Sequence, residues 1–195
     1  YLWNQFPHVI TMAITVGGFT IAGIAAWKML RKHEVAMFRK AFKVSIVAAL
    51  IGSLGLLATG HAQGQYLVRE YPMKMAAAEA LYEDTGNSAP FSVLATIDQK
   101  QQKAEHYLEV PGMLSFLAYD KFEGSLKGMK TLQKEMDEKY YPVVGKHIDY
   151  TPHVPTIYYT FRTMAGSAGL LFLVSLVGTI FAFRKQETEK KWFLR

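Results

Sequence analysis

The side chains best suited to bind a metal in this sequence are one histidine and one methionine, in two different apolar segments. His8 lies at the start of the first segment, where an imidazole either meets interfacial water or turns inward to a metal. Met164 lies just inside a later segment, where a lone Met is more often a packing residue than a ligand. Both are expected at a similar depth, so together they could hold one heme from opposite faces. Met/His ligation fills both axial positions, and such a heme moves electrons rather than binding oxygen.

Arg162 precedes Met164 by two residues, close to the expected membrane edge. Its side chain has two possible roles there, because a guanidinium can reach out to water or neutralise a heme propionate. A spacing of two places Arg162 and Met164 on nearly opposite faces of a helix. A joint role of the two residues at one heme would therefore need a bend or a long reach.

Lys74 and Glu79 lie in a polar segment and offer acid–base chemistry. A hydroquinone has two hydroxyls that must lose protons when its electrons leave, so a carboxylate could accept a proton while an ammonium holds an oxygen. The alternative is a solvated helix surface, where most Lys and Glu residues belong. A spacing of five does not place the pair on one helical face.

The sequence lacks the residues that several other chemistries require. The 195 residues include no Cys, which excludes disulfides, iron–sulfur ligation by cysteine and covalent c-type heme attachment within them. His147 and His153 are too isolated to indicate zinc, and no GxGxxG, P-loop or zinc-spaced Cys/His motif is present. The net charge of +6 does not indicate a nucleic-acid partner, because the basic residues cluster at the ends of apolar segments.

Three apolar segments must position these residues. Half of the residues are hydrophobic, yet the mean hydropathy is only +0.06, so a large polar region must dilute the membrane spans. We expect transmembrane helices at 8–30, 44–60 and 156–183. The second is short enough to be a buried helix of a soluble protein, and its neighbours favour a membrane. Because the chain starts at Tyr1, inside a largely apolar stretch, we expect it to be truncated at the front.

The basic residues predict the orientation of these helices. Lys and Arg are concentrated in the loop at 31–43 and in the tail at 184–195, which by the positive-inside rule both face the cytoplasm. The connector at 61–155 is then extracytoplasmic. A connector of this length needs structure of its own. We expect a helix from Pro72 to the turn at 85–87, a second helix opened by Thr96 and Gln99 as a capping box, and an amphipathic third helix within 123–140.

Four segments, in this order, resemble subunit I of cytochrome bd quinol oxidase, a membrane enzyme that oxidises quinol and reduces dioxygen to water. They are FPHVITMAITVGGFTIAGIAAWKML from residue 6, YPMKMAAAEALYE from residue 71, FRTM from residue 161, and EKKWFLR at the end of the chain. Four ordered matches are far more specific than one, and the resemblance covers almost the whole chain. It implies an all-α membrane protein with three transmembrane helices and a long, partly helical extracytoplasmic loop between the second and third.

The resemblance implies a role for each candidate residue. His8 and Met164 would be the axial ligands of a low-spin heme b, with Arg162 in the surroundings of that heme. The connector would be the quinol-binding loop, in which Lys74 and Glu79 are associated with quinol oxidation. It resembles the shorter of two loop classes, which favours menaquinol over ubiquinol. The implied location is the bacterial cell membrane, and the implied partners are a second oxidase subunit and small accessory subunits.

The resemblance also implies what this chain lacks. The family places the ligand of its high-spin heme b, several proton-pathway carboxylates and part of the heme d site outside these 195 residues. We therefore expect those two cofactors only in the complete subunit, and no oxygen reduction by this fragment alone. The competing hypothesis is a non-enzymatic three-span scaffold or receptor with an extracellular helical domain, in which His8 and Met164 merely pack.

Overall fold

Three long apolar helices dominate the computed structural model, which describes residues 2–184. They are α1 (Leu2–Leu30), α2 (Val35–Glu70) and α6 (Val154–Phe183), of 29, 36 and 30 residues. Each is long and apolar enough to cross a membrane, because about 20 residues suffice for a hydrocarbon core of about 30 Å. Three such helices confirm the predicted fold class, an all-α membrane protein.

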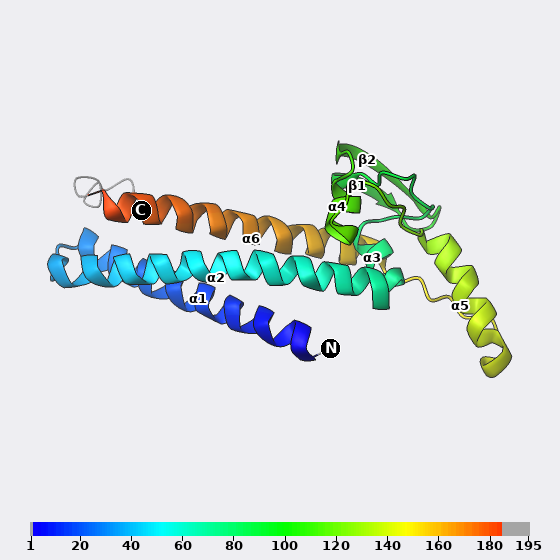
Figure 1. Ribbon diagram of the computed structural model, residues 1–195, viewed down its shortest axis with the longest axis horizontal. Coiled ribbons are helices and arrows are strands. Elements are labelled where there is room, and N and C mark those ends of the chain that lie inside the picture. The colour runs from blue at the N-terminus through cyan, green and yellow to red at the C-terminus, as the bar shows by residue number, and fades with distance from the viewer. Residues whose placement is uncertain (1, 185–195) are drawn as a thin grey trace. The chain divides into compact units, whose positions relative to one another are not determined.

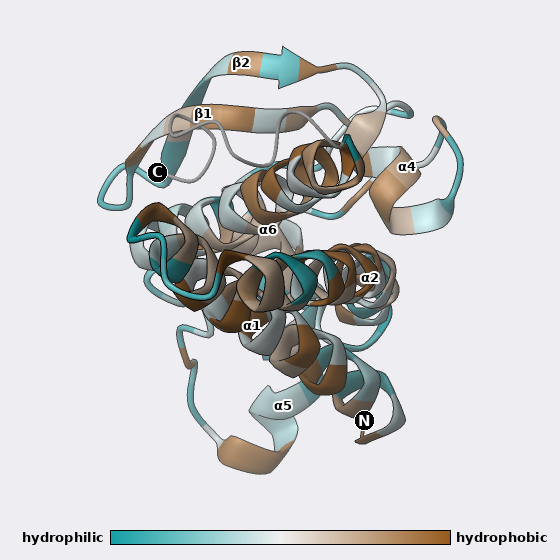
Figure 2. Cartoon of the chain, turned by 90° about the vertical axis from the view of Figure 1, so that its left-hand side faces the viewer, coloured by the Kyte–Doolittle hydropathy of each residue, from teal (hydrophilic) through white to brown (hydrophobic). Residues whose placement is uncertain are grey.

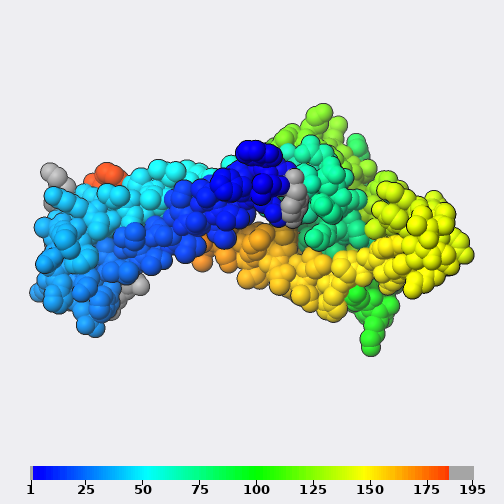
Figure 3. Space-filling view, turned by 90° about the horizontal axis from the view of Figure 1, so that it is seen from below, coloured from blue at the N-terminus to red at the C-terminus, as the bar shows by residue number. Residues whose placement is uncertain are grey.

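The fold divides into two compact units. The first comprises the residues up to Gly60 together with those from Gly166 onward, and the second comprises His61–Ala165. In the first unit, α2 lies between α1 and α6 (Figure 1). Figure 2 shows hydrophobic residues along all three long helices, and Figure 3 shows side chains of α1 against those of α2. Apolar residues on outward-facing helix surfaces are expected where lipid replaces water as the solvent.

Small residues set the packing of the first unit. A Cβ on Gly18 of α1 would lie 2.7 Å from the backbone nitrogen of Ala49 in α2, so the two helix backbones are almost in contact. On the other side of α2, the hydroxyls of Ser53 and Ser175 are fully buried and lie 3.1 Å apart, forming a hydrogen bond to α6. Close approach through small residues and interhelical hydrogen bonds are the usual means of helix association in a membrane.

The second unit contains the loop between α2 and α6. Its elements are α3 (Pro72–Ala78), β1 (Phe91–Asp98), β2 (Lys103–Val110), α4 (Met113–Tyr119) and α5 (Met129–Val144). One core joins α3, β1 and α5 to the first turns of α6, and it includes Ala77, Ala95, Met129 and the fully buried Tyr158. The core therefore holds the start of α6 against the loop.

The structure corrects one prediction for the loop. No helix follows Thr96 and Gln99, because β1 and β2 form an antiparallel hairpin there. Asp98 turns the chain by accepting hydrogen bonds from the backbone N–H groups of Lys100 and Gln101. The predicted capping box was wrong, because residues 91–98 are rich in aromatic and β-branched side chains that favour a strand.

Other element bounds differ from the expected ones. The predicted helix after Pro72 exists but ends at Ala78, because Ala80 has a φ of +53°. The amphipathic helix is confirmed as α5, and α2 extends further at both ends than 44–60. The tail at 184–195 and the EKKWFLR motif lie outside the described residues, except for Arg184.

Candidate functional site

A buried ion pair joins the loop to α6. Glu79 directly follows α3, and its two carboxylate oxygens accept hydrogen bonds from the guanidinium of Arg162, at 3.2 Å from Nη1 and 2.6 Å from Nη2. The Glu79 side chain is 1% exposed and that of Arg162 is 11% exposed. Such a paired, bidentate contact is the geometry in which proteins tolerate buried charges. The solvated alternative is thus excluded for Glu79.

Arg162 is held on every side by the second unit. Its Nε donates to the carbonyl of Ser92 at 2.7 Å, and Nη1 also donates to the carbonyl of Ala78 at 3.3 Å. The guanidinium carbon lies 4.3 Å from the ring centre of Phe91 and 4.5 Å from that of Tyr158. The faces of these two rings attract the guanidinium cation as well. Arg162 therefore has backbone and aromatic partners besides its carboxylate.

The carbonyl of Ser92 is available because the hairpin is irregular at this point. The pairing of β1 with β2 shifts between Ser92 and Leu94, which is a β-bulge. Besides the Arg162 bond, the same carbonyl accepts a hydrogen bond from the hydroxyl of Tyr158 at 3.3 Å. The hydroxyl of Tyr159 donates to the carbonyl of Ala95 at 3.0 Å. Three residues of α6 thus bind the backbone of β1.

Burial changes the acidity of Glu79. Loss of water around the carboxyl raises its pKa to about 7, while the hydrogen bonds and the charge of Arg162 oppose that rise. A carboxyl with a pKa near neutrality can both accept and release a proton under physiological conditions. Shifts of this kind cluster at functional sites, although structural ion pairs also produce them.

Lys74 is not brought to Glu79. It lies on the exposed side of α3, with its ammonium 5.7 Å from the ring centre of Tyr71, whereas Glu79 points into the core. The mismatch agrees with their spacing of five residues, which separates two side chains around a helix.

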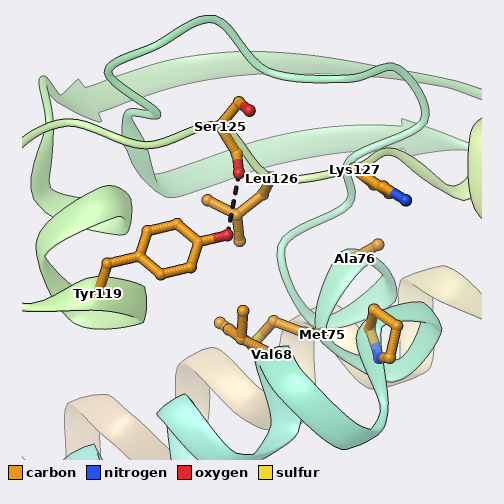
Figure 4. A pocket seen from close by; sticks show the side chains of 8 residues that line it. Val68, Met75, Ala76, Tyr119, Ser125, Leu126 and Lys127 are labelled. Atoms are coloured by element: carbon orange, nitrogen blue, oxygen red, sulfur yellow. Dashed lines mark hydrogen bonds between the residues drawn. The ribbon is translucent and has the colours of Figure 1, made fainter.

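A pocket of about 270 Å³ lies beside α3 (Figure 4). Pro72, Met75 and Ala76 of α3 form one part of its wall. The side chain of Tyr119 lies at the pocket and donates a hydrogen bond to the carbonyl of Ser125 at 2.9 Å. The remaining lining residues are Val68, Ser125, Leu126 and Lys127. The pocket is mainly apolar, with one ammonium and two hydroxyls, those of Tyr119 and Ser125, in its lining.

His8 belongs to the first unit and is held by α2. Its Nδ1 lies 3.0 Å from the hydroxyl oxygen of Thr59, and the side chain is half-buried. One ring nitrogen is therefore occupied by a protein partner. Among residues 2–184, the other nitrogen, Nε2, has no hydrogen-bond partner, so its lone pair can serve a metal.

Met164 belongs to the second unit and is 56% exposed. The contrast with the mostly buried Arg162 agrees with the expectation that the two residues occupy opposite faces of α6. Packing inside the described residues therefore does not account for Met164. No group of three or more His, Asp or Glu side chains within residues 2–184 could hold a metal ion. An imidazole and a thioether are a donor pair that can hold a heme iron.

Several residues around these sites were missed from the sequence. Tyr158 precedes Arg162 by four residues, and this spacing could have placed both on one helical face. Ser92 and Thr59 gave no such signal, because each meets its partner from a distant part of the chain. Their roles depend on a bulge and on a close helix approach.

Comparisons with known proteins agree with one another. The family model described as "Cytochrome bd terminal oxidase subunit I" matches residues 1–195. The chain is 45% identical over 194 residues to cytochrome bd ubiquinol oxidase subunit 1 of Bacillus subtilis, covering 100% of this chain and 40% of that protein. It is 23% identical over 243 residues to cytochrome bd-II ubiquinol oxidase subunit 1 of Escherichia coli, covering 98% of this chain and 47% of that protein.

A solved structure shows the same fold. The bd oxidase from Geobacillus thermodenitrificans matches with a TM-score of 0.79 and 25% identity, covering 98% of this chain and 40% of the matched chain. The chain thus spans less than half the length of each of these relatives. Sequence and fold agree over its whole length, and the chain belongs to the cytochrome bd terminal oxidase subunit I family.

Proposed function

We propose that this chain is the part of a bacterial respiratory oxidase subunit that oxidises quinol and holds the low-spin heme b. In the complete enzyme, the electrons would reduce dioxygen to water at sites outside these residues, where the high-spin heme b and heme d belong. The observation that carries the proposal is the buried pair of Glu79 and Arg162, which joins the substrate loop to the turn of α6 that includes Met164.

Glu79 would accept a proton from quinol. Oxidation of one quinol to quinone releases two electrons and two protons, so the site needs a base. With a pKa of about 7, the carboxyl is partly ionised at neutral pH and can take a proton. Arg162 keeps its bonds to the carbonyls of Ser92 and Ala78 when this happens, so protonation does not leave the guanidinium without partners.

The pocket beside α3 suits the ring of a quinol. Its wall of Val68, Met75 and Leu126 is apolar, and apolar walls with few polar groups are typical of small-molecule sites. Lys74 does not line this pocket and would act from the exposed side of α3, holding an oxygen of the substrate as it arrives. Both menaquinol and ubiquinol offer the required hydroxyls.

His8 and Met164 would hold the heme b iron. His8 offers Nε2, Met164 offers an exposed thioether, and the absence of Cys from the chain leaves a Met/His pair as the natural strong-field set. The heme, when bound, supplies one-electron transfer at a raised potential. Arg162, two residues from Met164, would lie in the surroundings of this cofactor while remaining paired with Glu79.

The proposal includes a location and partners. We place residues 31–43 and 184–195 in the cytoplasm and residues 61–155 outside the cell membrane, by the distribution of basic residues. A second oxidase subunit and small accessory subunits would complete the enzyme.

The proposal is tested in the full-length subunit by two variants. Met164→Leu removes the thioether with little change in volume, and we expect it to alter the low-spin signal in reduced-minus-oxidised spectra. Glu79→Gln should lower quinol turnover at least tenfold with heme content unchanged. Glu83→Gln is the matched control, because Glu83 is an exposed glutamate that pairs with Lys130. An unchanged spectrum removes Met164 as a ligand, and undiminished turnover removes Glu79 as the base.

A further inference from the structure

A hydroxyl of α2 meets the imidazole of His8. The Oγ1 of Thr59 lies 3.0 Å from Nδ1 of His8, although the two residues are 51 positions apart. The contact depends on close helix packing one turn earlier, where a Cβ on Gly55 would lie 2.6 Å from Cγ2 of Thr11. A glycine at that position lets α1 and α2 approach until the side chain of Thr59 reaches the ring.

The hydrogens of this contact can be assigned. A threonine hydroxyl has one hydrogen, and Oγ1 of Thr59 lies 2.7 Å from the carbonyl of Gly55 and 3.3 Å from that of Leu56. Donation to the carbonyl four residues earlier is the usual state of a helical threonine. The oxygen then accepts from His8, so Nδ1 carries the ring hydrogen. Nε2 is left with its lone pair, as a metal ligand requires.

The side of the ring next to Gly60 is not tightly packed. A Cβ on Gly60 would lie 3.5 Å from Cε1 of His8, which is ordinary van der Waals distance, so an alanine would fit beside the imidazole. The hydrogen bond to Thr59 is therefore the contact that sets the tautomer of the ring and limits its rotation.

We propose that Thr59 is the positioning residue of the heme ligand His8. The inference rests on the proposed function, in which Nε2 of His8 binds the iron. Histidines that bind metals usually donate their other N–H to an acceptor, which orients the ring and raises its basicity. A more basic ligand favours the oxidised metal. Thr59 therefore lowers the reduction potential of the heme and strengthens its retention.

The test uses the full-length subunit with redox titration of the low-spin heme. Thr59→Val keeps the branched shape and removes the acceptor, and we expect the midpoint potential to rise by about 59 mV, which is a tenfold change for a one-electron couple. Thr59→Ala should do the same if Val fails to fold. Thr59→Ser should restore the wild-type value. Thr20→Val is the matched control, because among residues 2–184 the hydroxyl of Thr20 bonds only the carbonyl of Val16, in its own helix.

The test separates a failure of the His8 ligand assignment from a failure of the proposed role of Thr59. If His8→Ala abolishes the low-spin signal while Thr59→Val and Thr59→Ala leave the potential unchanged, His8 is the ligand and the role of Thr59 is refuted. If His8→Ala retains the signal, the ligand assignment and the inference are both overturned. A shift in Thr59→Val that Thr59→Ser reverses and Thr20→Val lacks supports the inference.

Discussion

A carboxylate that is 1% exposed has two stable states, ionised with a partner or neutral, and Glu79 lies near the boundary between them. Arg162 favours the ionised state and burial favours the neutral one. Removing one member of such a pair strands the other charge, which typically costs about 3–5 kcal/mol. Protonation of Glu79 differs from such a removal, because Arg162 keeps its hydrogen bonds to the carbonyls of Ser92 and Ala78.

This balance predicts a pH dependence of turnover. As pH rises through about 7, Glu79 loses its proton and becomes able to accept one from quinol, so the rate should rise over this range in the wild-type subunit. Glu79→Gln should lose that titration as well as most of the rate. The measurement is quinol oxidation between pH 5.5 and about 8.5, with Glu83→Gln retaining the wild-type profile.

The stability of the folded subunit should fall over the same rise in pH. Because the pKa of Glu79 is raised from 4.5 to about 7 on folding, its contribution is fully present below pH 4.5 and is lost as pH rises through about 7. The shift corresponds to a difference on the order of 3 kcal/mol.

The residues of the site and their roles stay a prediction from the sequence, to which the structure adds the contacts. The choice of His8, Met164, Arg162, Lys74 and Glu79 came from residue types together with four ordered motifs. The pairing of Glu79 with Arg162 did not, because 83 residues separate them and no local pattern links their positions. Long-range contacts of this kind depend on packing that a periodic pattern does not encode.

At the scale of elements, the long helices were predictable and the loop was less so. Uninterrupted apolar runs specify a membrane helix almost by length alone. The hairpin was missed because a capping-box spacing, Thr96 to Gln99, outweighed the strand-forming residues around it. Periodicity of two in a short segment is weak evidence until a partner strand is known. The bulge at Ser92, which supplies a partner to Arg162, was beyond any sequence signal.

The approach of α1 to α2 gives a prediction for helix packing. In Gly18→Ala the new Cβ would lie 2.7 Å from the nitrogen of Ala49 and 2.8 Å from the carbonyl of Ser45, both backbone atoms that cannot move aside. We expect a loss of about 1–3 kcal/mol in stability and a lower Tm in detergent. Gly17→Ala is the control, since no described atom lies within 4 Å of its Cβ. Equal Tm values for the two variants would contradict this packing.

At the scale of the whole molecule, the orientation of the loop can be tested. The absence of Cys from the 195 residues simplifies the experiment. In a subunit whose only cysteine is Gln101→Cys, in the exposed turn between β1 and β2, we expect labelling of intact cells by an impermeant maleimide. His33→Cys, in the exposed turn between α1 and α2, should react only after the membrane is opened. The reverse pattern would invert the proposed topology.

The ion pair also bears on how this family can vary. Arg162 and Met164 are two residues apart on one helix, a rise of about 3 Å, so their separation is set by helix geometry and not by the loop. Among residues 2–184, the hydrogen-bond partners of Arg162 lie at the end of α3 and in the first residues of β1. Insertions at exposed tips, such as the turn at residues 99–102, cost little. An insertion there would lengthen the loop without changing the distance between Arg162 and Met164 along α6.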